Sequence, residues 1–144
     1  MFDRILYPTD CSDVAIKAVS YIEQLKEAGA KKVTILHVLD KKYLYETAHE
    51  VFVDFAAIEN SQRKIVTEEC NEVVARLRGK GLDVKVRIEK GIPFQEILRV
   101  ANEENASLIV IGSHGKSNVQ EMLLGSVSEA VIRHAIQPVL VIKR

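Results

Sequence analysis

The sequence predicts an open α/β sheet, mostly parallel, with helices on both faces. Five short apolar segments have the composition of strands, and segments with helical periodicity separate them. The strand-like segments are residues 4–7, 33–39, 83–88, 108–111 and 139–142. A parallel neighbour needs a long crossover between strands, and the helices supply one. With 144 residues, no internal repeat and no linker, the chain is predicted to form a single domain over residues 1–144.

The first half of the chain alternates strand and helix. Pro8 ends the strand 4–7, and the next helix carries an apolar stripe and ends at Gly29. The members of that stripe are Ala15, Ala18, Val19, Ile22 and Leu25. The strand 33–39 is rich in β-branched residues and contains His37, which we interpret as a packed, hydrogen-bonded core residue rather than a ligand.

The middle and second half contain one segment, residues 40–60, whose conformation the sequence leaves open. Its apolar residues recur at helical spacing and predict an ordinary core or partner contact; they are Leu44, Ala48, Val51, Phe52 and Phe55. A helix over 62–78 follows, and Pro93 begins another that runs through residue 101. The last helix is predicted to begin at Ser126, with Ser126 and Glu129 forming a capping box, and to end before Pro138.

Composition excludes several classes of function. Lys plus Arg and Asp plus Glu number 20 each, and no long basic run occurs, so we expect no nucleic-acid partner. No apolar run approaches the length of a membrane span, and we expect a soluble, cytoplasmic protein with no membrane partner. The two cysteines, Cys11 and Cys70, lack metal-ligand spacing, so no metal site is predicted and a reducing compartment fits.

A glycine-containing loop follows the strand 108–111. Its pattern is Gly112-x2-Gly115-x9-Gly125-Ser126, and a helix begins at its end. Glycines let backbone N–H groups approach a ligand closely, and the first N–H groups of a helix have no partner within it, so the loop suits a phosphate. It is not a Walker A loop, because Val110 stands where the first glycine would be, and no G-x-G-x-x-G occurs. Each glycine taken singly could also be a plain turn residue.

This loop, the Pro8-Thr9-Asp10 segment, the His37-Val38 pair and the closing strand 139–142 together resemble the universal stress protein family, in its ATP-binding branch. The resemblance covers the whole chain. It implies a Rossmann-like fold of the adenine nucleotide alpha hydrolase-like kind, with five strands in the order 3-2-1-4-5. Strands 1 and 4 would then lie side by side with connections leaving in opposite directions, which is where such sheets bind ligands.

The resemblance also implies a set of nucleotide-binding residues. On the adenosine side these are Pro8, Thr9, Asp10 and, through its backbone, Val38. Around the phosphates they are Gly112, His114, Gly115, Lys116, Gly125, Ser126, Val127 and Ser128. The implied ligand is ATP, with AMP or another adenine nucleotide as the alternative, and Mg2+ held mainly through the phosphates. From the residues alone, Asp10 and Ser126 could serve only at helix starts, and His114 could be a solvated loop residue.

Three functional hypotheses follow. The first is an ATP-binding regulatory switch of the stress-response type, acting on a protein partner that the sequence does not identify. The second is an ATPase, slow or activated by a partner, for which the loop offers His114 and Lys116 but no Walker B aspartate, and no catalytic residue is assigned. The third is a structural dimer module without a ligand, against which the intact glycines argue.

The last strand also predicts the assembly. Under the implied strand order, Val139–Ile142 is an edge strand that is apolar on both faces. Proteins usually cover such an edge, and a second copy paired across a twofold axis uses one patch twice. We therefore expect a homodimer through Val139–Ile142, which is also how family members that this chain resembles assemble.

Overall fold

The structure, a computed structural model, describes residues 1–9, 15–42, 44–46, 54–113 and 124–143. Within these residues the chain forms a five-stranded sheet in the order β3-β2-β1-β4-β5, and each neighbouring pair is parallel. The strands are β1 (Arg4–Pro8), β2 (Lys32–Asp40), β3 (Asp83–Gly91), β4 (Leu108–Gly112) and β5 (Val139–Ile142). The predicted fold class and strand order are confirmed.

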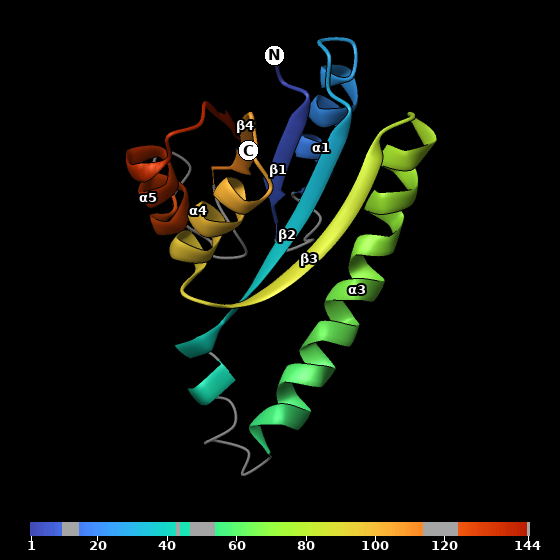
Figure 1. The fold of residues 1–144 in the computed structure, drawn as a ribbon. Helices are drawn as coiled ribbons and strands as arrows, with labels where there is room; N and C mark the ends of the chain where they lie inside the picture. Colours follow the sequence, from blue (N-terminus) through green and yellow to red (C-terminus); the bar gives the residue numbers. More distant parts are fainter. Residues whose placement is uncertain (10–14, 43, 47–53, 114–123, 144) are drawn as a thin grey trace.

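The helices form two layers, one on each face of the sheet (Figure 1). They are α1 (Ala15–Leu25), α3 (Phe55–Gly79), α4 (Pro93–Glu103) and α5 (Ser126–His134). Because side chains alternate along a strand, β1 sends Ile5 and Tyr7 into the core under α1 and α3, and Leu6 into the core under α4 and α5. The two layers therefore share a sheet that is buried on both sides, as continuous apolar strands predict.

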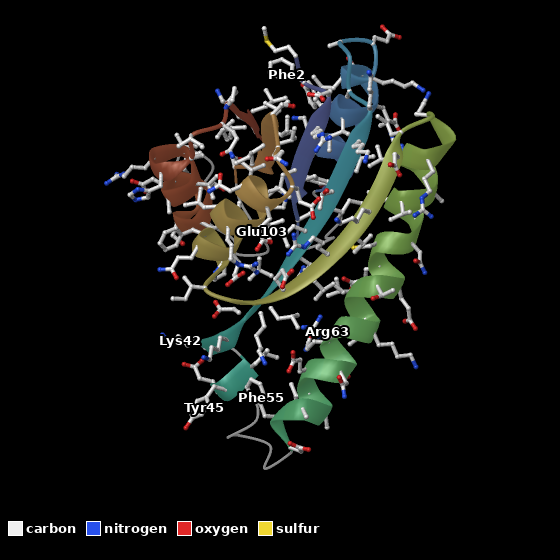
Figure 2. The ribbon with its side chains drawn as sticks, in the orientation of Figure 1. Phe2, Lys42, Tyr45, Phe55, Arg63 and Glu103 are labelled. Carbon is white, nitrogen blue, oxygen red and sulfur yellow. The ribbon has the colours of Figure 1, made fainter. Side chains whose placement is uncertain are left out.

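The strands β2 and β3 pair over nine residues each and continue past the end of β1 (Figure 1). The long helix α3 runs along this extension. The Arg63 guanidinium donates to the Ile88 carbonyl at 3.0 Å, and the Lys90 ammonium lies 5.3 Å from the centre of the Phe55 ring. Phe55 and Arg63 are labelled in Figure 2, on the lower half of α3. These contacts secure a part of the sheet that has no β1 residue beside it.

Several boundaries differ from the prediction, and two of them bear on the sheet extension. The strand β3 runs to Gly91 rather than residue 88, and α3 begins at Phe55, seven positions before residue 62. Asp54 caps α3, since its carboxylate accepts from the Ala56 N–H at 3.2 Å.

In the segment 40–60 the described residues are helical at 41–42, 44–46 and from Phe55 onward, whereas Asp40 ends β2 and Asp54 is the N-cap of α3. Leu44 is fully buried, in agreement with the predicted core contact, and Phe55 is half-buried. Ala48, Val51 and Phe52 lie outside the described residues. None of the helices in the described residues is long and apolar enough to span a bilayer.

Candidate nucleotide site

The strands β1 and β4 lie side by side at the centre of the sheet, with Ile5 opposite Leu108. The connection from β1 leads through α1 to β2, and the connection from β4 leads through α5 to β5 on the other side. The chain therefore leaves these two neighbours in opposite directions. Ligands of open parallel sheets bind beyond the carboxyl ends of strands at such a point.

The start of α5 is fixed to the end of β4 by two short hydrogen bonds. The Gly125 N–H donates to the Ser113 carbonyl at 2.8 Å, and the Ser128 hydroxyl donates to the Gly112 carbonyl at 2.7 Å. Ser128 and Ser113 are both buried. The amino end of α5, with its partial positive charge, is thereby placed at the carboxyl end of β4.

The predicted capping box at this helix is wrong. The N-cap of α5 is Gly125, with no side-chain cap hydrogen bond, and Ser126 is the first helical residue. The Glu129 carboxylate pairs with Arg133 at 2.8 Å instead of turning back to the helix start. The exposed Ser126 hydroxyl and the N–H groups of the first turn therefore lie where the loop meets the helix.

The adenosine side of the predicted site lies where β1 ends beside β2. The last residue pair between them is Pro8 with Leu36, and the Thr9 N–H still donates to the Leu36 carbonyl at 2.9 Å. Residues two apart in a strand direct their backbone groups to the same side. Because the carbonyl of Leu36 faces β1, the N–H and C=O of Val38 face the same side, beyond the last residue of β1. In the described residues no β1 residue stands opposite Val38 in the register. One donor and one acceptor therefore face this edge.

The structure places eight of the twelve predicted residues at one edge of the sheet. They are Pro8, Thr9, Val38, Gly112, Gly125, Ser126, Val127 and Ser128. The other four, Asp10, His114, Gly115 and Lys116, lie outside the described residues. Sequence reasoning did not foresee the contact of the Ser128 hydroxyl with the Gly112 carbonyl. It predicted a hydrogen-bonded His37, and the structure gives the partner of the ring as the Thr9 carbonyl at 3.0 Å.

The carboxyl and guanidinium groups with shifted pKa values in the described residues lie elsewhere, in salt bridges around β3. A hydrogen bond from Lys85 lowers the pKa of Glu104, and one from Arg87 lowers the pKa of Glu103. Arg87 also contacts Glu104 at 2.9 Å, so it bridges β3 to the end of α4. Figure 2 labels Glu103 at this place. These groups tie an edge strand to a helix and are not arranged around the end of β1 and β4.

Comparison with known proteins decides the family. A model of the universal stress protein family matches residues 1–143. The chain belongs to this family. The universal stress protein MJ0577 of Methanocaldococcus jannaschii is 36% identical, over 100% of this chain and 96% of its own length. The universal stress protein YxiE of Bacillus subtilis is 32% identical, over 99% of this chain and 100% of its own.

Solved structures of universal stress proteins share the fold. The structure of MJ0577 has a TM-score of 0.89 at 38% identity and covers 100% of this chain and 97% of its own. A universal stress protein in complex with cAMP has a TM-score of 0.66 at 26% identity, covering 99% and 97% of the two chains. The predicted family and the observed β3-β2-β1-β4-β5 order therefore agree with each other.

Proposed function

We propose that this universal stress protein binds ATP at the carboxyl edge of its sheet and acts as a nucleotide-dependent regulatory switch in the stress response. The observation that carries the proposal is the attachment of the α5 amino end to Gly112 and Ser113, beside the end of β1. A helix amino end held rigidly at the switch point of a parallel sheet is suited to a polyphosphate.

The residues present fit the two halves of ATP. The backbone N–H and C=O of Val38 supply a donor and an acceptor of the kind that the edge of an adenine ring needs. The first turn of α5 supplies N–H groups and the Ser126 hydroxyl for phosphate, and Lys116 would add a cation. The related protein in complex with cAMP supports an adenine nucleotide as the ligand class.

A magnesium ion would be held mainly through the phosphates of the nucleotide. No group of three or more His, Cys, Asp or Glu side chains that could hold a metal occurs in the part of the chain that the structure describes. Mg2+ commonly keeps several waters and binds through substrate phosphates with few protein ligands. The chain's own residues would therefore bind and orient the nucleotide, and the ion would neutralise charge on it.

We further propose that the protein is a cytoplasmic homodimer, joined through β5. The strand is at the edge of the sheet, and its side chains pack into the core on both faces. Ile132, in α5, and Ile136, between α5 and β5, are 41% and 85% exposed. A second copy placed antiparallel along β5 would satisfy the open backbone groups and cover this apolar surface.

The test is a titration of the purified protein with Mg-ATP, Mg-GTP and FMN, with thermal unfolding and phosphate release measured together. At a concentration one hundred times the dissociation constant, ATP should add about 2.7 kcal/mol to the free energy of unfolding. Gly115→Val should remove this effect, because a side chain blocks the approach of backbone to phosphate. A melting temperature that responds to FMN but not to ATP would refute the proposal, and rapid phosphate release would favour an ATPase.

A further inference from the structure

His37 holds the end of β1 through a contact between side chain and backbone. Its Nδ1 atom lies 3.0 Å from the carbonyl oxygen of Thr9, 28 positions away in the sequence. A carbonyl oxygen only accepts, so the proton of this hydrogen bond is on Nδ1. His37 is half-buried and lies on the same face of β2 as Ile35, beneath α1 and α3.

The two backbone groups of Thr9 are thus held by β2 in different ways. Its N–H donates to the Leu36 carbonyl at 2.9 Å, as in an ordinary parallel ladder. In a continuing ladder its carbonyl would accept from the N–H of Val38. Here that carbonyl accepts from the His37 ring, which approaches from the α1 and α3 face. The imidazole takes the place of a ladder donor at the point where β1 stops.

This exchange has two consequences at the proposed adenosine side. The His37 ring holds the Thr9 carbonyl, so it fixes the orientation of the peptide group at the end of β1. The register of β1 with β2 ends at Pro8 and Leu36, so the N–H of Val38 lies beyond the last residue pair and faces the same edge. One side chain therefore influences both elements that would contact the nucleoside, although it lies on the opposite face from Val38.

We propose that His37 is a positioning residue for the adenosine half of the ligand, acting through Thr9 and Val38 as an Nδ1–H donor. The inference rests on the proposed ATP site and adds to it a requirement on one histidine tautomer. The role predicts a selective effect: His37 should affect binding of the nucleoside and not of the phosphates. The phosphates would bind at the start of α5, which follows a different strand, β4.

Three variants test this role by calorimetry with ATP, AMP and inorganic tripolyphosphate. His37→Leu removes the donor and keeps similar bulk, and His37→Asn retains an N–H donor close to the position of Nδ1. His134→Leu is the matched control, because His134 is exposed at the end of α5. We expect H37L to weaken ATP and AMP equally, by about tenfold, as for one lost hydrogen bond. We expect tripolyphosphate binding to be unchanged, H37N to recover most of the affinity, and H134L to behave as wild type.

The tautomer is checked separately, by nitrogen NMR of the His37 ring in the wild-type protein, where Nδ1 should carry the proton. Three results would each overturn the inference while leaving the ATP site intact. They are equal ATP affinity in wild type and H37L, a loss of tripolyphosphate affinity in H37L as large as the loss of ATP affinity, and a His37 ring protonated only on Nε2. Failure of the wild-type protein to bind ATP or AMP would overturn both. If H37L does not fold, His37→Gln, whose amide nitrogen sits nearer the Nε2 position, replaces it and should show the same selective loss.

Discussion

Replacing Ser128 with alanine removes the hydroxyl that ties α5 to β4. The side chain is buried, at 5% exposure, and its oxygen lies 2.7 Å from the Gly112 carbonyl. Losing this bond, which is part-buried, should cost about 1 to 3 kcal/mol in the free energy of unfolding. A domain of 144 residues has an unfolding entropy of about 0.3 kcal/mol/K. The melting temperature of Ser128→Ala should therefore fall by about 3 to 10 °C.

The neighbouring serine gives a crossed control. Ser126 is exposed at the first turn of α5, so Ser126→Ala should change stability by less than about 0.5 kcal/mol. Under the proposed function its hydroxyl binds a phosphate, and its loss should weaken ATP by about 10- to 150-fold, the range for a hydrogen bond to a charged group. Calorimetric melting and ATP titration of the two variants measure both effects. Ser128→Ala melting within about 1 °C of wild type would refute the structural role assigned to the Gly112 bond.

The remaining predictions concern pH, assembly and turnover. Arg87 lowers the pKa of Glu103, and Lys85 and Arg87 lower that of Glu104. These pairs therefore stabilise the fold at pH values above 4.5, the ordinary pKa of a glutamate, and the stabilisation is lost as the pH falls below 4.5 toward the lowered pKa values. Arg87→Met should therefore show a smaller loss of melting temperature than wild type between about pH 5 and pH 3. Val141→Pro removes a backbone donor of β5 and should give a monomer or an aggregate by light scattering, whereas a monomeric wild type would exclude the β5 dimer. Purified protein should hydrolyse ATP far more slowly than the enzyme median of about 10 per second, and turnover near that rate would favour the ATPase.

Periodic apolar segments made most of the fold predictable. The strand β5 occupies the predicted residues, because Val139 to Ile142 are bounded by Pro138 and Lys143. The strand β3 was predicted too short for a physical reason: its last residues, Glu89 and Lys90, are charged. They remain in the strand because Glu89 pairs with Arg99 of α4 at 3.4 Å and Lys90 pairs with Glu59 of α3 at 3.2 Å. Charge pairing between elements leaves no periodic signal along one segment.

The sequence predicted at which edge of the sheet the candidate site would lie, but not the hydrogen bonds that hold its residues. Glycine spacing placed the loop after β4, and the resemblance supplied the strand order that brings β1 beside it. The helix begins at Ser126 as predicted, but the capping box failed because the N-cap is Gly125, whose N–H is held by the Ser113 carbonyl. The role of the Ser128 hydroxyl depends on the packing of α5 against β4, which no local pattern specifies.

The pairing of β1 with β4 affects the order in which the sheet can form during synthesis. The Arg4 N–H and the Ser107 hydroxyl bond across 103 positions, so β1 is synthesised long before the strand that flanks it. All four pairings of the sheet described here are parallel, and none can form as a local hairpin. Until β4 and α5 have left the ribosome, β1 has a partner on one side only and the edge that would hold a nucleotide is incomplete. Nascent chains that stop before α5 should therefore not bind ATP, and nucleotide retention would distinguish them from chains that have passed it.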